Sequence, residues 1–475
     1  MPALPSTSRK ALVPARIIII GASITGLATA CILRRSGHEV VVVEKGDGKY
    51  RVQSRYNTVN NASLVPDESG KADAHTFRSP PNMTRILQRW GLQSQLAKSG
   101  MIIDQLRFLE GQSGKTIGVL KLYEELLRDL MADFLLIQHG DLVSIFQDLA
   151  RREGVEIRYN TAVVKVERVP LAALLSDGDI LHSDLIVGAD GPLRSISRDA
   201  VLLREIEELP TQHVCFWFSV PLEDLQADPD LENLEGICEK RNWNLWLGDG
   251  FVIYGTCHKT SGRYSLCITT EMEGDMTEYQ GNWTKQYPVD HFDLRLERFE
   301  PRIQKLLKMA GFVIPTCHVY IPEPENLICD LDKVILAGQS AHPTMPDGMH
   351  STAMCIEDVD ALDYLLTRIK HVDEIPRVLS AHEELRMERC ASARDWESRK
   401  LRMLTLLSGE DRDLRDAKIR CLSECEDMEE KEYAFNDLWG EEVDFYAYDP
   451  IEQADNWWSM YGTVISRRSS TTDSL

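Results

Sequence analysis

The hydrophobic pattern is most regular near the N-terminus, where it predicts a strand, a helix and a second strand in succession. Ile17–Ile20 are β-branched and apolar on both faces, which is typical of a strand at the centre of a parallel sheet. From Ile24 apolar residues recur at helical spacing, and Gly37 then ends the predicted helix. A second apolar strand, Glu39–Val43, follows. The pattern therefore predicts a β-α-β unit.

Further helices are predicted on the same grounds in the first third of the chain. Residues 82–92 follow two prolines and open on an asparagine, which indicates a short helix with an asparagine cap that ends at Gly91. Residues 141–153 form an amphipathic helix that ends at Gly154, and a strand over 155–159 follows.

The pattern then changes to strands and returns to helices. Residues 180–198 read as an apolar strand, a Gly-Ala-Asp-Gly turn and the start of a helix. Between His213 and Thr270 apolar and polar positions alternate in several short runs, so we expect an antiparallel sheet that forms the floor of a substrate chamber. Residues 333–366 again predict a strand, a turn and a long helix, and the chain after Pro376 is helical and highly charged.

The turn inside the first β-α-β unit carries candidate chemistry. Gly21, Ser23 and Gly26 match the dinucleotide fingerprint G-x-G-x-x-G, with serine in place of the second glycine. Glu44 ends the second strand, where a carboxylate can accept the hydroxyl hydrogens of an adenosine ribose, while the helix N-terminus attracts a pyrophosphate. The alternative is an ordinary β-α-β unit in which Glu44 is a solvated strand end.

Composition and charge narrow the class of protein. The 475 residues are 43% hydrophobic and 27% charged, which is ordinary for a globular protein of two or three domains. A net charge of −22 argues against nucleic acid or an anionic membrane as partner. The 11 cysteines form no C-x-x-C pair, so neither a disulfide framework nor a metal site is expected, and a reducing, cytoplasmic location fits. No signal peptide or membrane span is predicted, and we expect residues 1–15 and 466–475 to be disordered.

Four segments in a fixed order carry a resemblance to a known family. They are the β-α-β unit with Glu44, PPNMTRILQRWGL at 80–92, DLIVGADG at 184–191, and VILAGQSAHPTMPDG at 334–348 followed by AMCIEDVDAL at 353–362. Together they resemble the class A FAD-dependent monooxygenases, which include p-hydroxybenzoate and salicylate hydroxylases and many fungal enzymes of secondary metabolism.

The resemblance implies an α/β fold: a Rossmann-like FAD-binding domain, an inserted antiparallel β-sheet substrate domain and a helical C-terminal region. We place the FAD-binding domain at 16–75, 105–200 and 328–375. The substrate domain would comprise 76–104 and 201–327, and the helical region 376–465. FAD would be the cofactor, with NAD(P)H as a transient co-substrate.

The resemblance also implies site residues for the adenosine and pyrophosphate end. Gly21, Ser23, Gly26 and Glu44 would hold the ADP part. Asp190 and Gly191 would match an Asp-Gly motif associated with the pyrophosphates of FAD and NAD(P)H. Asp190 can alternatively be a turn carboxylate that caps the following helix. Ser195 and Arg198 are displaced by one residue from the family spacing.

The flavin end departs from the family pattern. Gln339 stands where the family has an aspartate, and only a shifted Gly348 remains of a glycine-rich loop, so that Met349 and Ser351 carry side chains there. Cofactor contacts are still expected from Gln339, Gly348, Ser351 and Thr352. Two expected arginines are absent, and His139 and Trp217 stand in those regions. We expect His139 to reach the cofactor.

Two residues, His350 and Trp217, are the candidates for a catalytic role. Trp217 can equally be a core residue of the sheet, and His342 and His350 can be structural residues near a turn. The expected function is oxygen transfer: NAD(P)H reduces FAD, and the reduced flavin uses dioxygen to hydroxylate or epoxidise a hydrophobic organic substrate. The altered flavin end leaves two alternatives open, a non-redox cyclase or isomerase with FAD structural or lost, and a non-catalytic binding protein.

Overall fold

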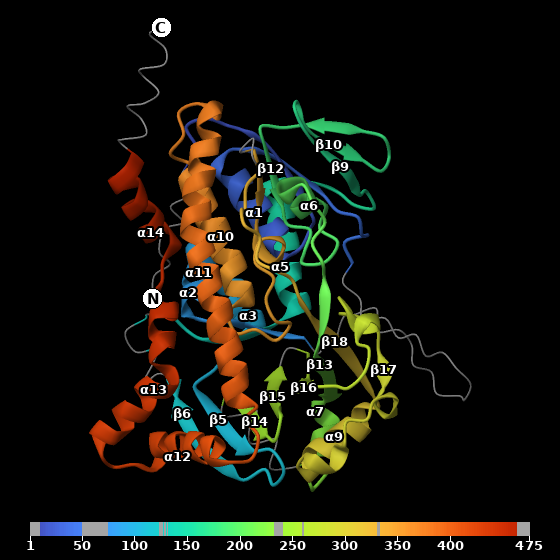
Figure 1. Cartoon of the computed structure of the whole chain (residues 1–475), viewed down its shortest axis with the longest axis vertical. Helices are drawn as coiled ribbons and strands as arrows, with labels where there is room; N and C mark the ends of the chain where they lie inside the picture. Colours follow the sequence, from blue (N-terminus) through green and yellow to red (C-terminus); the bar gives the residue numbers. More distant parts are fainter. Residues whose placement is uncertain are drawn as a thin grey trace, which may run out of the picture.

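The computed structural model describes residues 10–49, 75–122, 127, 130, 132–231, 241–258, 261–329 and 333–462. The predicted disordered tail and most of the predicted disordered lead lie outside these residues. Figure 1 shows two halves: a parallel sheet with helices α1, α5 and α10 in the upper half, and a large mixed sheet in the lower half. The long helix α11 (Ile375–Leu404) runs alongside both.

The upper half is built on a five-stranded parallel sheet of order β19-β12-β1-β2-β8. Its strands are β1 Arg16–Ile20, β2 Glu39–Val43, β8 Glu156–Arg158, β12 Leu185–Gly188 and β19 Val334–Leu336. Ile17–Ile20 are buried between β2 and β12, as a central parallel strand requires. The chain leaves β1 toward β2 on one side and later enters β12 on the other. The carboxyl end of β1 therefore lies at a switch point, where doubly wound sheets bind ligands.

Helix α1 packs on this sheet, and two further helices pack on α1. The three are α1 (Ile24–Ser36), α5 (His139–Glu153) and α10 (Ser351–Leu366), and α1 contacts both of the others. In α5 the predicted apolar face is buried, and Gly154 in the left-handed conformation ends the helix. The β-α-β prediction and the amphipathic helix are thus confirmed, although α5 begins at His139, before the predicted start.

The lower half is an eight-stranded sheet of order β17-β18-β13-β16-β15-β14-β5-β6. Its strands are β5 Gln105–Glu110, β6 Thr116–Lys121, β13 Leu209–Pro221, β14 Asn242–Gly248, β15 Phe251–His258, β16 Arg263–Glu271, β17 Tyr287–Pro288 and β18 Phe312–Tyr320. All neighbours pair antiparallel except β14 and β5. Helices α7 (Leu222–Gln226) and α9 (Pro301–Ala310) contact β13. The antiparallel sheet predicted from the alternating pattern is confirmed.

One expected boundary is wrong. Residues 105–121 were predicted in the FAD-binding part, but β5 and β6 pair with the eight-stranded sheet. The cause is physical: β5 joins β14 from a distant part of the chain, and no local pattern announces such a pairing.

Two small sheets complete the strands. One is β3-β7-β4, with β3 Thr76–Ser79, β4 Met101–Ile102 and β7 Leu135–Gln138; the other is β11-β10-β9, with β9 Val163–Arg168, β10 Leu171–Leu175 and β11 Ile180–His182. The remaining helices of the first half of the chain are α2 Pro81–Arg89, α3 Gln93–Ser99 and α6 Ile196–Leu202.

The predicted asparagine cap at the start of residues 82–92 is wrong. Helix α2 already begins at Pro81 with Pro80 as its N-cap residue. The Asn82 side chain instead donates a hydrogen bond of 2.7 Å to Glu357 on α10. The Asn82 side chain thus makes a tertiary contact instead of capping the helix, as the local sequence pattern had predicted.

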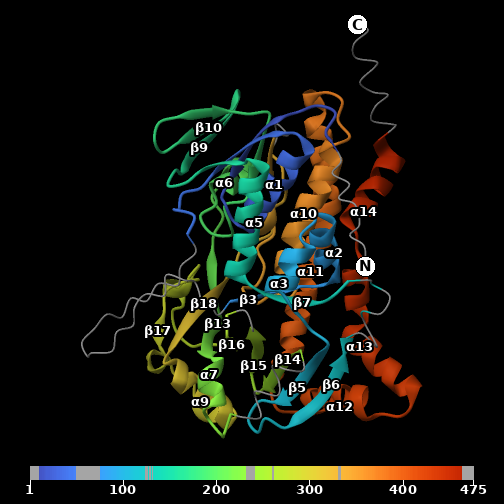
Figure 2. The same ribbon diagram turned by 180° about the vertical axis from the view of Figure 1, so that it is seen from behind.

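The C-terminal region is helical, as predicted. After α11 follow α12 (Glu410–Glu424), α13 (Met428–Ala447) and α14 (Pro450–Trp457). Helix α12 packs on strand β6, α13 contacts α2, and α14 contacts α10 and α11, so this region ties both halves together. Figure 2 shows α12 and α13 beside β5 and β6 from behind. Among the described residues, no helix is long and apolar enough to cross a bilayer.

Candidate functional site

A cleft of about 490 Å³ opens at the carboxyl ends of β1, β2 and β12 and extends to the start of α10. It brings together most of the residues predicted for the cofactor from distant parts of the chain. Those that line it are Gly21, Ser23, Glu44, His139, Asp190, Gly191, Gln339, Ser351 and Thr352. The residues predicted to contact the adenosine and those predicted to contact the flavin thus line one continuous cleft.

The glycine turn at one end of the cleft has no room for side chains. Gly21 has φ +99°, and a Cβ on it would lie 2.5 Å from the carbonyl oxygen of Ala189. A Cβ on Gly26 would lie 1.9 Å from the carbonyl oxygen of Gly21, so α1 can pack against the turn only with glycine there. Gly26 supports the turn from beneath and is not itself among the lining residues. The N-terminus of α1 consequently faces the cleft, which suits an anionic pyrophosphate.

The side chain of Ser23, which replaces the second glycine of the fingerprint, is accommodated by two hydrogen bonds within the turn. Its hydroxyl accepts a hydrogen bond from the Gly26 N–H at 3.2 Å and donates one to the Ala189 carbonyl at 2.9 Å. Ser23 is the N-cap residue of α1, in extended backbone conformation. The side chain that replaces the second glycine is thus folded into the helix cap and leaves the cleft open.

The Glu44 carboxylate lies at the edge of the same turn. It accepts hydrogen bonds from the N–H groups of Ala22 at 2.7 Å and Gly46 at 2.6 Å, one on each oxygen. An ionised carboxylate has about four acceptor positions, so two are left for the hydroxyls of a ribose. Glu44 is half-buried and not a freely solvated strand end.

Asp190 follows β12, the strand next to β1. Its carboxylate accepts hydrogen bonds from the Ser195 hydroxyl at 2.7 Å, the Ser197 N–H at 3.2 Å and the Ser197 hydroxyl. It therefore holds the start of α6, as the turn-carboxylate alternative predicts. The neighbouring Gly191 lines the cleft as well, so both interpretations of Asp190 are compatible with its position.

Arg198 joins this turn to the flavin end. The side chain is buried, and its guanidinium donates hydrogen bonds to the Ser340 carbonyl at 3.0 Å and the Pro192 carbonyl at 2.8 Å. Burial lowers the pKa of Arg198 against the opposing effect of Asp190. Although Ser195 and Arg198 are displaced by one residue from the family spacing, Arg198 still links the turn after β12 to the segment after β19.

The flavin end of the cleft is formed by the segment after β19 and by the first turn of α10. Gln339 does not project freely: its amide donates to the Thr344 hydroxyl at 2.7 Å, and its oxygen accepts from the Thr344 N–H at 3.0 Å. The amide that replaces the aspartate therefore closes the 339–344 turn. Ser351 and Thr352 line the cleft from α10, and His139 lines it from α5.

Gly348 and His350 are not among the residues that line the cleft. A Cβ on Gly348 would lie 2.5 Å from a carboxylate oxygen of Glu397 on α11. The glycine is therefore required for the close approach of this loop to α11. The Glu397 carboxylate accepts the His350 N–H at 2.7 Å. The predicted cofactor contact of Gly348 therefore has no support in its position.

The imidazole of His350 is fully buried against aromatic rings. Its centroid lies 4.8 Å from that of Trp396 and 4.7 Å from that of Phe445. Burial, with Arg389 and Lys400 nearby, lowers the pKa of His350 well below its ordinary value. A neutral imidazole packed among aromatic rings does not support the catalytic assignment of His350, and the structural interpretation fits better. Trp217 is likewise outside the cleft lining and lies buried in β13.

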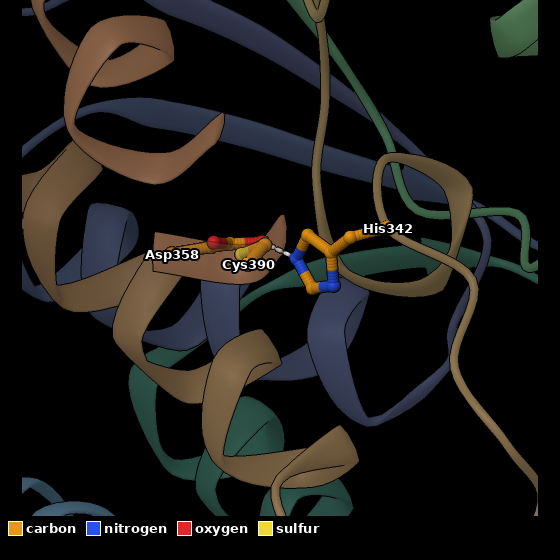
Figure 3. A group of neighbouring side chains, drawn as sticks. All are labelled: His342, Asp358 and Cys390. Carbon is orange, nitrogen blue, oxygen red and sulfur yellow. Dashed lines mark hydrogen bonds and ion pairs between the residues drawn. The ribbon is translucent and has the colours of Figure 1, made fainter. Parts of the chain in front are cut away.

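A buried network of charged residues supports the segment after β19 on the side that faces away from the cleft. Figure 3 shows His342, Asp358 and Cys390 converging from a loop and two helices. The Asp358 carboxylate pairs with His342 at 2.6 Å and with Arg386 at 2.7 Å, and it accepts the Gly338 N–H at 2.7 Å. Burial lowers the pKa of His342, but the ion pair with Asp358 outweighs this and raises it above its ordinary value.

This network is better explained by ion pairs than by metal ligation. The Asp358 oxygens are taken by two cations and a backbone amide, and the Arg386 guanidinium also lies 3.5 Å from the Cys390 sulfur. A cation held by the same donors would compete with that guanidinium. The network instead fixes Gly338, and with it the turn of Gln339, against α10 and α11.

Comparisons with known proteins agree with this geometry. The family model of the FAD binding domain matches residues 15–236. The FAD-dependent monooxygenase atnJ of Arthrinium sp is 24% identical over 422 residues, which cover 88% of this chain and 92% of its own length. The FAD-dependent monooxygenase cfoG of Aspergillus candidus is 27% identical over 391 residues, covering 79% of this chain and 82% of its own.

The chain is similar to FAD-dependent monooxygenases over most of its length, and residues 15–236 match the FAD binding domain. The 3-hydroxybenzoate 6-hydroxylase 1 of Aquipseudomonas alcaligenes is a bacterial relative, 23% identical over 366 residues, covering 74% of this chain and 80% of its own. Among solved structures, a salicylate hydroxylase substrate complex superposes with a TM-score of 0.70 at 16% identity, covering 94% of this chain and 98% of that chain. At such identity the likeness shows the shared fold.

The matched FAD binding domain includes the adenosine end of the cleft, whereas Gln339, Ser351 and Thr352 lie beyond it. Sequence reasoning missed Glu397, Arg386 and the role of Asp358. The segment AMCIEDVDAL did contain Asp358, and an acidic pair on an otherwise apolar helix was the available signal. Glu397 lay in a charged helical stretch and carried no signal of burial.

Proposed function

We propose that this FAD-dependent monooxygenase uses NAD(P)H and dioxygen to hydroxylate or epoxidise a hydrophobic organic substrate in secondary metabolism, in the cytoplasm. One observation carries the proposal: the glycine turn, Glu44 and the start of α10 line a single cleft that joins the predicted adenosine and flavin ends. That the fungal relatives atnJ and cfoG are named FAD-dependent monooxygenases supports the same chemistry.

The residues of the cleft would divide the work of holding FAD. Glu44 would accept the ribose hydroxyls, and the N-terminus of α1 behind Gly21 would attract the pyrophosphate. Gln339, Ser351 and Thr352 would lie along the flavin end, and His139 would approach it from α5. Bound FAD supplies the redox chemistry, taking a hydride from NAD(P)H and passing electrons to dioxygen.

The protein's own part in the reaction is to position the substrate and exclude water. Strand β3 stands between the flavin end of the cleft, where Phe77 lines it, and the buried face of the eight-stranded sheet. A substrate held against that face would lie in apolar surroundings, where hydrogen bonds to a polar group are stronger than in water.

An anaerobic reduction experiment tests the proposal. The purified protein, loaded with FAD, is mixed with NADPH or NADH, and the flavin absorbance is followed with and without a panel of aromatic substrates. We expect bleaching, accelerated by a substrate, and recovery of the colour with product formation when oxygen is admitted. A flavin that stays oxidised with both reductants and every substrate would contradict the proposal.

A second candidate is a non-redox cyclase or isomerase on the same fold. A specific observation favours it: the His350 N–H belongs to the loop expected at the flavin ring, yet it is bonded to Glu397. Fewer backbone amides are then available to a reduced, anionic flavin. An FAD-loaded protein that is never reduced but converts a substrate without consuming oxygen would establish this alternative.

A further inference from the structure

A second group of potential metal ligands lies at the corner between α12 and α13, outside the cleft. Cys421 lies on α12, Cys425 is the C-cap residue of that helix, and Glu430 lies in the first turn of α13. One ligand atom of each residue lies within 4.8 Å of the other two. Figure 1 shows α12 and α13 at the lower left, whereas the cleft helices α1 and α5 lie in the upper half. A site at this corner is therefore separate from the cofactor cleft.

Local structure brings the three side chains together. Cys421 and Cys425 are four residues apart and lie on one face of α12, where the Cys425 N–H donates to the Cys421 carbonyl at 3.1 Å. Asp427 then caps α13, and its carboxylate accepts the N–H groups of Glu429 at 2.9 Å and Glu430 at 3.4 Å. Helix α13 thus begins close to the end of α12. The Glu430 carboxylate accepts a hydrogen bond from the Cys425 thiol at 3.1 Å.

The exposure of these two cysteines distinguishes them from the others. Of the ten cysteines that the structure describes, eight are buried, whereas Cys421 and Cys425 are partly exposed. Glu430 is exposed and forms no ion pair with another described residue. In the buried network behind the flavin end, by contrast, Asp358 is paired with Arg386 at 2.7 Å. The donors between α12 and α13 are therefore accessible to an ion from solvent and are not occupied by a basic side chain.

Two sulfurs and a carboxylate oxygen are donors that suit Zn²⁺, whereas Mg²⁺ and Ca²⁺ prefer oxygen alone. Zinc binds sulfur at about 2.3 Å and carboxylate oxygen at about 2.0–2.2 Å, so its tetrahedral donors are about 3.5–3.8 Å apart. Side-chain rotations that draw the three atoms slightly closer reach this geometry. Between Ser423 and Glu432 six of the ten residues are acidic and one, Lys431, is basic. The resulting negative potential attracts a cation to the corner.

We propose that Cys421, Cys425 and Glu430 bind one Zn²⁺ ion, with a water molecule as its fourth ligand. The two thiols release their protons to solvent and bind the ion as thiolates. The sequence predicts no metal site because the cysteines form no C-x-x-C pair. A helix also brings a C-x-x-x-C pair together, and Glu430 joins that pair through the turn between the helices. The ion fastens the start of α13 to the end of α12, the helix that packs on β6.

Zinc titration of the full chain, stripped of metal and reduced with a phosphine, tests the proposal. We expect calorimetry to show one Zn²⁺ per chain, and Co²⁺ used as a probe to give thiolate charge-transfer and tetrahedral d–d bands. Cys421→Ser and Cys425→Ser should each weaken zinc binding about 100-fold or more, because a serine hydroxyl does not supply a thiolate. Glu430→Gln should weaken it about tenfold through the loss of one ligand. The matched control Glu429→Gln removes the same charge from the same helical turn and should change the affinity about twofold at most.

Several outcomes would overturn the inference. Undiminished zinc binding by the double variant Cys421→Ser/Cys425→Ser would show an adventitious ion elsewhere on the chain. No zinc binding by the reduced protein, or Co²⁺ spectra without thiolate bands, would also contradict the site. Equal weakening by Glu430→Gln and Glu429→Gln would reduce the role of Glu430 to its charge. Thiol titration before each experiment ensures that a disulfide does not imitate loss of the site, and circular dichroism of each variant separates loss of a ligand from loss of folding.

Discussion

Removal of the Glu44 carboxylate is the sharpest perturbation of the adenosine end. Glu44→Ala deletes a group that accepts the N–H groups of Ala22 and Gly46 and has two acceptor positions left for a ribose. A hydrogen bond to a charged group contributes about 1.5–3 kcal/mol. Because Glu44 is half-buried, we count one such bond net for FAD. The dissociation constant for FAD should then rise about 10- to 100-fold.

The assay is a titration of the FAD-free protein with FAD, followed by quenching of flavin fluorescence. The matched control is Glu39→Ala, which removes an exposed carboxylate at the opposite end of the same strand and should leave the affinity unchanged. An affinity for FAD that is the same in Glu44→Ala and Glu39→Ala would refute the assignment of Glu44 to the ribose.

Three further predictions concern the glycine turn and the buried charges. Gly26→Ala should abolish FAD retention on purification, because its Cβ would lie 1.9 Å from the Gly21 oxygen; Gly440→Ala, with 3.8 Å to its nearest neighbour, should retain FAD, and equal retention would contradict the turn geometry. Arg386→Met should lower the free energy of unfolding by about 3–5 kcal/mol, because it removes one cationic partner from each of two buried carboxylates, Glu357 and Asp358. The control Arg399→Met removes an exposed pair and should cost less than about 1 kcal/mol in urea unfolding, and equal costs would argue against the network. Burial raises the pKa of Glu397 from 4.5 to about 7. Because the folded protein then binds a proton that the unfolded chain has lost, the free energy of unfolding should fall by about 3 kcal/mol as the pH rises from 4.5 to about 7. Glu397→Gln should flatten this slope in urea unfolding at several pH values, whereas the exposed Glu388→Gln should keep it; an unchanged slope in Glu397→Gln would remove Glu397 as its cause.

The adenosine end could be predicted from sequence because its requirements are local. The turn of Gly21 and Gly26, the apolar strand Ile17–Ile20 and Glu44 all lie within one β-α-β unit, where spacing fixes geometry. The antiparallel strands of the sheet were predictable for the same reason, since alternation shows within each strand. The alternation did not say which face of the sheet, that of Trp217 and Trp243 or the opposite one, meets the FAD-binding half. The cavity that these two residues line together with Thr76 and Arg78 of β3 shows it.

The flavin end resisted prediction because distant helices decide it. The local pattern offered Gly348 and His350 as candidates, but α11 brings Glu397 against Gly348 and aromatic rings against His350. In the same way, the local sequence predicts a helix cap at Asn82, but the side chain bonds to Glu357 on α10. A packing partner hundreds of residues away leaves no spacing signal in the segment it contacts.

A crystal structure of the protein with FAD tests the central claim most directly. We predict an extended cofactor in the cleft, with the adenosine ribose at Glu44, the pyrophosphate at the N-terminus of α1 behind Gly21, and the flavin ring between Gln339 and Ser351. Density for FAD in another place, in the reverse direction, or with its ring far from the start of α10 would contradict the account.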